Sequence, residues 1–458
     1  TLATRIRARD VSVREVMSAH LEQIAAVNPA VNAIVSALEP DAALALADAA
    51  DASGPDATKP LFGLPIAFKD LDDAVGFPTT SGSPIFRDFR PEADSAMVAR
   101  LRSAGVIPIG KTNVPEFGLG SHTYNPVFGP TRNPWNLERT AGGSSGGAAV
   151  AVATGMLPLA DGSDMGGSLR NPGNFNSVVG FRPTPGLVPK CPSTQPWLPL
   201  SVKGPIARSV SDVAFFLSAL AGYSTCDQLS FDIDASAFAG DLGIETKALR
   251  VAWCPDLGGL PLDPQVRKVI ESTRPAFAAL GIDLVEAAPD FTDADQIFKD
   301  LRAFSLTGME PVLREHRDLM KPEAIWNIEE GLKLSARDVA VAMGKQAELF
   351  MRVRTFMQTY DAYVCAVNQV PPFPVDTPWP KVIDGVQMET YIDWMKSAYF
   401  VTATRAPAIS VPAGFTDDGL PVGIQIVGKY RSDLALLKLA NAVEQAIALP
   451  NNRPPIVR

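Results

Sequence analysis

Apolar residues recur at helical spacing close to the start of the chain. The recurring positions are Val13, Val16, Met17, His20, Leu21 and Ile24. Ser12 followed by Glu15 forms a capping-box pattern directly before them. The pattern predicts an amphipathic helix that ends at Asn28-Pro29. A second, Ala-rich helix is expected over residues 41–53.

Further along the chain, short apolar runs alternate with helical patterns. Strands are expected at 64–68, 106–109, 249–253, 282–286, 361–367, 408–411 and 424–427, and helices at 94–104, 264–280 and 434–447, the last capped by Asp433. Strands that alternate with helices over most of a chain predict an α/β architecture. Because no repeat or linker interrupts the pattern, one domain over 1–458 is favoured. Residues 290–360 break the rhythm, and 290–400 is predicted to be a mainly helical cap or insertion.

Composition and charge narrow the function classes. The chain has 458 residues, 46% of them apolar, with 41 Lys and Arg against 50 Asp and Glu, a net charge of −9. Such a composition builds a sizeable core, and a net acidic chain binds polyanions poorly. Nucleic acid and anionic membranes are therefore not expected as partners. Only three histidines occur, His20, His122 and His316, so neither a multi-histidine metal site nor a His-based relay is expected.

The four cysteines and the apolar runs point to an ordinary intracellular protein. Cys191, Cys226, Cys254 and Cys365 include no C-x-x-C pair, and they are too sparse for a disulfide framework. No stretch approaches the roughly 20 apolar residues of a membrane span. No charged-then-apolar signal segment opens the chain. A cytoplasmic location, with no metal and no cofactor, is expected.

Residues 105–112, GVIPIGKT, match the phosphate-loop pattern G-x-x-x-x-G-K-[ST]. That motif requires a strand, then a flexible loop, then a helix that begins near its lysine. Here a helical pattern precedes, the variable positions are apolar, and Pro115 opposes a helix after Thr112. A nucleotide-binding protein remains only as an alternative of another class, testable by nucleotide titration.

Two loops rich in glycine and serine are the most informative part of the chain. Gly142 to Gly147 reads GGSSGG and opens into a helix of small residues, and 164–170 reads DMGGSLR. Glycines let backbone N–H groups approach a ligand closely, so such a loop can form an anion nest or an oxyanion hole. In that geometry Ser168 is a candidate nucleophile. With no histidine nearby, a buried neutral lysine could activate it, and Lys69 at the end of the strand LPIAFKD is the best-placed candidate.

The full set of motifs resembles the amidase signature family. The matching segments are LPIAFKD (64–70), KTNVPEFGLG (111–120), FGPTRNPW (128–135), GGSSGG (142–147), DMGGSLRNP (164–172), VGFRPTPGLVP (179–189), GPIARSVSD (204–212) and 410–428. The resemblance implies that family's fold, a central mixed β-sheet flanked by helices. It also implies an amidase that cleaves non-peptide C–N bonds through an acyl-enzyme.

Carried over by position, the resemblance implies a role for each residue of the two loops. The catalytic lysine falls on Lys69, the bridging serine, held by an unusual cis peptide bond, on Ser144, and the nucleophile on Ser168. The neighbouring Ser145 leaves a one-residue uncertainty in the bridging role. The backbone N–H groups of the oxyanion hole fall on Met165, Gly166, Gly167 and Ser168, and the substrate pocket is expected at Gly118, Leu119 and Ser121.

The substrate is less sharply indicated than the chemistry. If several aromatic residues of the cap face the site, they favour a bulky apolar or aryl substrate, which means anilides, aryl or alkyl amides, and carbamates. The residues are Trp326, Phe350, Phe356, Trp379, Tyr391 and Trp394. Packing within the cap is the competing explanation for these residues. The expected partner is a small-molecule amide or carbamate, with the chain a monomer or homodimer. Two alternatives stay open: a glutamine amidotransferase subunit that works on charged tRNA, and a non-catalytic binding protein on the same fold.

Overall fold

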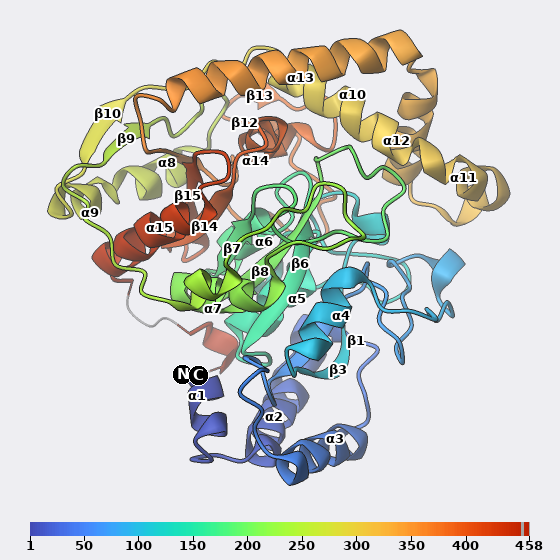
Figure 1. The fold of residues 1–458 in the computed structure, drawn as a ribbon. Helices are drawn as coiled ribbons and strands as arrows, with labels where there is room; N and C mark the ends of the chain where they lie inside the picture. The colour runs from blue at the N-terminus through green and yellow to red at the C-terminus, as the bar shows by residue number, and fades with distance from the viewer. Residues whose placement is uncertain (450–452, 458) are drawn as a thin grey trace.

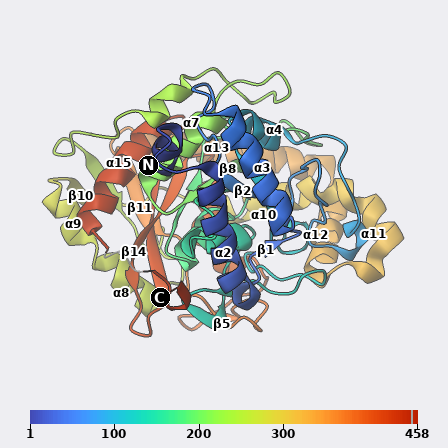
Figure 2. The same ribbon diagram turned by 90° about the horizontal axis from the view of Figure 1, so that it is seen from below.

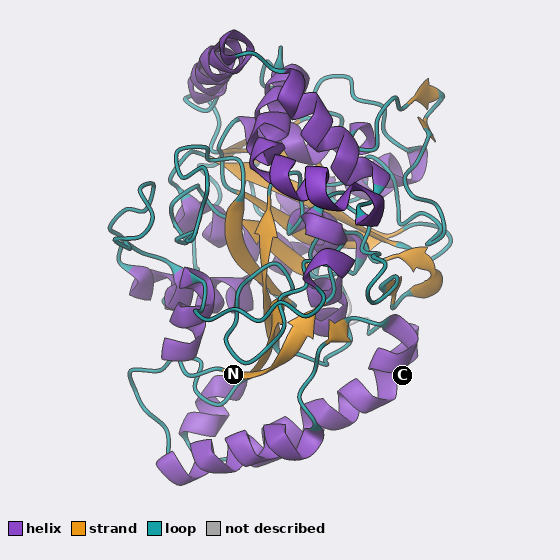
Figure 3. Cartoon of the chain, turned by 90° about the vertical axis from the view of Figure 1, so that its right-hand side faces the viewer, coloured by secondary structure: helices purple, strands orange, loops and turns teal. Residues whose placement is uncertain are grey.

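A mixed sheet of eight strands lies at the centre of the computed structural model, which describes residues 1–449 and 453–457 (Figures 1 and 3). In spatial order the strands are β10 (Asp283–Glu286), β9 (Arg250–Trp253), β11 (Ala362–Ala366), β15 (Pro421–Gly428), β14 (Ala408–Phe415), β7 (Val179–Arg182), β8 (Val202–Ala207) and β6 (Leu159–Asp164). The strands β10, β9 and β11 run parallel, and every following pair is antiparallel. The predicted α/β fold with a mixed central sheet is confirmed.

A smaller sheet adjoins the edge strand β6. It contains β1 (Ile34–Val35), β3 (Ile107–Thr112) and β2 (Pro65–Lys69), with β2 parallel and β1 antiparallel to β3. The carboxylate of Asp161, on β6, accepts the backbone N–H of Lys69, on β2, at 3.1 Å. This side chain takes the place of a ladder hydrogen bond and joins the two sheets. Two-stranded hairpins complete the strands, β4 (Arg132–Asn133) with β5 (Asn136–Thr140), and β12 (Val382–Ile383) with β13 (Val386–Gln387).

Alternate residues of the central strands face two separate cores. On β9, Val251 and Trp253 belong to one apolar cluster and Ala252 to another. On β11, Val364 joins the first cluster and Tyr363 the second. Because successive side chains of a strand point to opposite faces, both faces of this sheet are buried. Continuous apolar strands are expected in that situation.

Helices cover both faces of the sheet (Figures 1, 2 and 3). The N-terminal helices α1, α2 and α3 pack beneath the small sheet, and Figure 2 shows α2 and α3 crossing that side. The helices span Leu2–Arg7 (α1), Val13–Val31 (α2), Pro40–Ser53 (α3), Ala96–Ser103 (α4), Gly146–Ala153 (α5), Arg170–Phe175 (α6), Val210–Leu220 (α7), Pro264–Glu271 (α8), Arg274–Ala279 (α9), Lys396–Ala403 (α14) and Asp433–Ile447 (α15).

A mainly helical segment lies within the region predicted as a cap, 290–400. It consists of α10 (Ala294–Leu306), α11 (Glu310–His316), α12 (Pro322–Lys333) and α13 (Ala336–Phe356), which form the upper layer in Figure 1. The strand β11 follows it directly and pairs with β9 and β15 in the central sheet. Residues after 356 thus return to the main sheet before the chain reaches position 400.

Two predicted helix boundaries are wrong. The first long helix does begin with the capping box of Ser12 and Glu15, but it continues through Pro29 to Val31. The Asn28 side chain accepts the N–H groups of Ala33 and Ile34 and so satisfies the backbone beyond the helix. The helix expected over 264–280 is two helices, α8 and α9, interrupted at Ser272 and Thr273.

The phosphate-loop pattern forms no phosphate loop. Gly110, Lys111 and Thr112 lie in strand β3, and Lys111 is fully buried. Its ammonium group donates to the Asp72 carbonyl and the Thr79 hydroxyl. The lysine of this motif is therefore buried and hydrogen-bonded to protein groups, so it is not placed to bind a phosphate.

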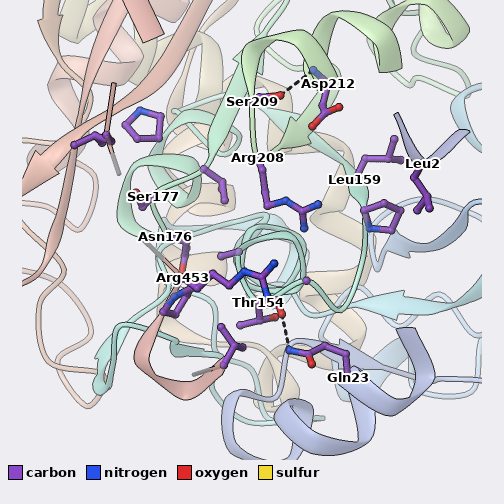
Figure 4. Close-up of a pocket in the computed structure, with 18 of the residues that line it drawn as sticks. Leu2, Gln23, Thr154, Leu159, Asn176, Ser177, Arg208, Ser209, Asp212 and Arg453 are labelled. Carbon is purple, nitrogen blue, oxygen red and sulfur yellow. Dashed lines mark hydrogen bonds between the residues drawn. The ribbon is translucent and has the colours of Figure 1, made fainter. Parts of the chain in front are cut away.

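Terminal segments enclose a cavity of about 870 Å³ (Figure 4). Its lining includes Leu2 of α1, Gln23 of α2, Arg208 and Arg453, and Gln23 donates across it to the Thr154 carbonyl at 2.7 Å. It shares no lining residue with the glycine–serine loops 142–147 and 164–170. Within 1–449 and 453–457, no helix has the length and apolar character needed to cross a bilayer.

Candidate active site

Lys69, the last residue of β2, is fully buried among serine hydroxyls. Its Nζ atom lies 2.8 Å from the Oγ atoms of both Ser144 and Ser145, and 3.0 Å from that of Ser163. No carboxylate of the described residues lies within ion-pair distance of this Nζ. The fold thus brings Lys69 and Ser144 together, and Ser163 is a neighbour that the sequence did not indicate.

Burial determines the charge state of Lys69. Removal from water disfavours the ammonium form and lowers the pKa of Lys69 to about 7. The positive charge of Lys203 lowers this pKa further, while the carboxylates of Asp72, Asp161 and Asp164 oppose the shift. Near neutral pH a substantial fraction of Lys69 is thus an uncharged amine.

The loop that contains Ser144 is held from behind. The Gly143–Ser144 peptide bond is cis, at the position where the resemblance places such a bond. The Gly143 carbonyl accepts the Ser121 hydroxyl at 2.5 Å, and Ser121 in turn accepts from the Asn171 amide at 2.8 Å. Ser121 is therefore a support for this loop, and it does not line the cavity described below, contrary to the prediction.

The second glycine–serine loop is organised by one buried carboxylate. Asp164 at the end of β6 accepts from Arg170 at 2.8 and 2.9 Å and from Arg182 at 3.1 Å. Burial raises the pKa of Asp164, but the two guanidinium groups outweigh it and hold this pKa well below its usual range. The same carboxylate accepts the backbone N–H groups of Gly167 and Leu169, so the loop is fixed on both sides of Ser168.

The backbone N–H groups of this loop differ in their availability. The Gly167 N–H donates to Asp164 at 3.1 Å, so its inclusion among free donors was wrong. No described residue accepts a hydrogen bond from the N–H groups of Met165, Gly166 or Ser168. Three of the four predicted donors are therefore open to a ligand.

A cavity of about 120 Å³ connects the two loops. Ser144, Ser163 and Ser168 line it, as do Gly118 and Leu119 of the predicted pocket. Its other lining residues are Leu71, Phe117, Gly120, Met165, Gly166, Ser201, Phe298, Arg302, Leu306 and Met395. Four serines (Ser144, Ser163, Ser168 and Ser201) line this space, and Lys69 lies behind it in hydrogen-bond contact with Ser144 and Ser163.

None of the six aromatic residues singled out from the cap sequence lines this cavity. Five of the six pack against other aromatic rings, for example Trp394 stacked on Phe175 at 6.2 Å and Trp326 edge-on to Tyr391 at 5.8 Å. The ring of Trp379 instead contacts the Lys381 ammonium. The aromatic residues that do line the cavity are Phe298 and Phe117. Helical spacing from Phe298 to Arg302 and Leu306 was a signal that could have identified this face of the cap.

The two buried or half-buried histidines act within the scaffold. His122 accepts or donates at the Thr140 hydroxyl (2.8 Å) and the Val375 carbonyl (2.7 Å), and burial lowers its pKa to about 4. The His20 ring lies 3.1 Å from the Met156 carbonyl. Neither ring lines the cavity that contains Ser168.

The chain resembles known proteins over nearly its whole length. The Amidase family model matches residues 15–437. An acylamidase of Rhodococcus erythropolis is 34% identical, covering 99% of this chain and 96% of that protein. A glutamyl-tRNA(Gln) amidotransferase subunit of Acidothermus cellulolyticus is also 34% identical, over 97% of this chain and 93% of its own length. The solved structure of a bacterial aryl acylamidase superposes with a TM-score of 0.89 at 26% identity, covering 97% of this chain and 95% of that one.

The chain belongs to the amidase signature family. It is an enzyme that hydrolyses amide bonds.

The carboxylate of Asp164 gives a test of how the Ser168 loop is held. Asp164→Asn should lower the free energy of unfolding by about 3–5 kcal/mol, because two buried guanidinium groups lose their counter-charge. The exposed pair of Asp283 and Arg250, 3.0 Å apart, supplies the control, and Asp283→Asn should cost less than about 1 kcal/mol. Urea denaturation of both variants measures the difference. Equal, small losses would show that Asp164 does not organise the loop.

Proposed function

We propose that the chain is a serine hydrolase that forms an acyl-enzyme on Ser168. The observation that carries the proposal is the 2.8 Å contact of buried Lys69 with Ser144, whose side chain lines the same cavity as Ser168. A serine is a weak nucleophile until a neighbouring base removes its proton. A lysine whose pKa lies near 7 can act as that base at neutral pH.

The hydroxyls around Lys69 match a neutral amine. An uncharged amine has two N–H donors and one lone pair, so it can donate to Ser145 and Ser163 and accept from Ser144. Ser144, rather than Ser145, suits the bridging role because Ser144 lines the cavity and Ser145 does not. In the proposed step the Ser144 proton passes to Lys69, the Ser168 proton passes to Ser144, and Ser168 Oγ attacks the substrate carbonyl carbon.

The free N–H groups of Met165, Gly166 and Ser168 would stabilise the charge that develops on the carbonyl oxygen. As the C–N bond breaks, the proton returns from Lys69 through Ser144 to the departing nitrogen. Water then attacks the acyl-enzyme by the same route, the carboxylic acid is released, and Ser168 regains its proton. No metal or cofactor enters this cycle.

The substrate is proposed to be a small amide with an apolar portion. Phe298, Met165, Leu306 and Met395 give the cavity an apolar wall that would accommodate aryl or alkyl groups. Similarity to an acylamidase and to an aryl acylamidase supports anilides and aryl or alkyl amides. Carbamates also contain a carbonyl carbon bonded to nitrogen, so the proposed substrates include them. The enzyme would act on free small molecules in the cytoplasm as a monomer or homodimer.

The main alternative is a glutamine amidotransferase subunit, which the similarity to glutamyl-tRNA(Gln) amidotransferase chains favours. Purified enzyme assayed with anilides, primary amides, carbamates and glutamine separates the two. Turnover of anilides or carbamates at least about ten times faster in kcat/KM than glutamine is expected. Glutaminase activity alone would instead support the amidotransferase function, and no acyl adduct with any reactive ester would support a non-catalytic binding protein.

The nucleophile can be tested by substitution. Ser168→Ala should abolish turnover and labelling by a fluorophosphonate, because Ser168 is the cavity serine that lies in the same loop as the free N–H groups of Met165 and Gly166. Ser201→Ala removes a second serine of the same cavity and should keep the label. Mass spectrometry of the labelled proteins and circular dichroism of both variants provide the readouts. Undiminished labelling of Ser168→Ala would refute the assignment.

The proposed role of Lys69 as the base predicts how kcat/KM depends on pH. Only neutral Lys69 accepts a proton, and its pKa near 7 means that the neutral fraction rises as pH increases. We expect kcat/KM to increase about tenfold between pH 6 and pH 8 and then level off. Initial rates with an anilide that does not ionise in this range measure the profile. Full activity well below pH 6 would contradict a lysine base.

A further inference from the structure

Arg302 is a buried cation on the wall of the cavity that contains Ser168. It lies on α10, is 5% exposed, and lines the cavity together with Phe298 and Leu306. These residues are four positions apart and therefore share one face of the helix. The cap thus presents one guanidinium group between two apolar side chains.

The guanidinium group has only neutral partners. It donates through Nη1 to the Asn327 amide oxygen and through Nη2 to the Tyr391 hydroxyl. No carboxylate of the described residues lies within ion-pair distance of it, whereas the buried Arg170 and Arg182 both contact Asp164. Buried charges in proteins are ordinarily paired, so Arg302 departs from the rule that the other two follow.

The neighbouring charged groups do not supply the missing anion. Lys321 is a second cation close by, and its ammonium donates to the Leu119 carbonyl. The Glu116 carboxylate is engaged by the Ser83 hydroxyl at 2.7 Å and by the Lys321 backbone N–H at 2.8 Å. Glu323 acts electrostatically on Lys321 but forms no ion pair with Arg302. Neither Arg302 nor Lys321 forms an ion pair with a described residue, although Glu116 and Glu323 act electrostatically on Lys321, so Arg302 still lacks a direct anionic partner.

We propose that Arg302 binds a carboxylate of the substrate, so that the enzyme prefers amides that carry a carboxylate away from the scissile bond. A guanidinium has five N–H donors, and the two neutral contacts leave donors for a ligand. Its planar edge matches a carboxylate, and such charge-assisted hydrogen bonds are strong. The inference rests on the proposed function and adds a substrate class to it.

Matched substrates test the preference on either side of the scissile bond. The acyl-side pair is the mono-4-nitroanilide of glutaric acid and its ω-carboxamide. The amine-side pair is 4-acetamidobenzoate and 4-acetamidobenzamide. On one of these sides, kcat/KM for the carboxylate should exceed that for the carboxamide by about tenfold or more. Arg302→Gln should reduce this ratio to about one, and Arg302→Lys should retain part of it.

A matched control separates this role from general attraction of anions. Arg314→Gln removes an exposed cation of the same cap, on α11, and should leave the ratio unchanged. A second readout needs no turnover: glutarate or 4-aminobenzoate should protect the enzyme from fluorophosphonate labelling better than the corresponding amide. This protection should also disappear in Arg302→Gln.

The outcomes distinguish the two proposals. Hydrolysis of the neutral amides with no carboxylate preference on either side, and no selective protection, would overturn the role of Arg302 alone. A ratio that Arg302→Gln leaves intact, or an equal fall for both members of a pair, would also overturn it. Absence of hydrolysis together with absence of Ser168 labelling would overturn the proposed function itself.

Discussion

The proposed chemistry depends on the exclusion of water from Lys69. A lysine on the surface is protonated at neutral pH and cannot accept a proton. At the end of β2 the ammonium is fully buried, and hydroxyl groups surround it instead of a carboxylate. Lys111 on the adjacent strand is buried equally and its pKa is also lowered by burial, but the Asp70 carboxylate, 3.8 Å from its Nζ, opposes that shift. A close counter-charge would stabilise the ammonium form and raise the lysine pKa, so that little neutral amine would be present at neutral pH to accept a proton.

The loop around Ser168 contains buried groups that are charged and paired, in contrast to Lys69. The paired charges of Asp164, Arg170 and Arg182 hold the backbone of this loop rigid. Arg170 also donates to the Ala398 carbonyl on α14, at 2.9 Å. The Asp164–Arg170 pair thereby connects strand β6, the Ser168 loop and helix α14. Asp164 and Lys69 have nearly the same burial, and their partners alone decide which of them stays charged.

The parts of the site that could be predicted from the sequence lie in short local motifs. Lys69 follows an apolar strand, and Ser144 and Ser168 lie in glycine-rich loops, so each is recognisable from its neighbours in the chain. Phe298 and Arg302 are not, because only the packing of the cap brings them to the cavity. The same reason explains why the cap was expected to continue to position 400: β11 reads locally as a strand, but its pairing with β9 and β15 is a long-range property. Helix ends were also predicted incorrectly where a side chain, as at Asn28, satisfies the backbone beyond a proline.

The carboxylate bridge between Asp161 and the Lys69 N–H has a mechanical consequence. Lys69 belongs to the small sheet, whereas Ser163 and the loop to Ser168 extend from the edge of the large one. The cluster of Lys69 with its serine neighbours therefore depends on how two sheets, each with its own backbone hydrogen bonds, pack against each other at β2 and β6. A slight opening of that seam would admit water to the lysine and return it to its charged state, with every strand still intact. Under the proposed mechanism, activity would therefore depend on how closely the two sheets pack, and it would be lost before the secondary structure changed.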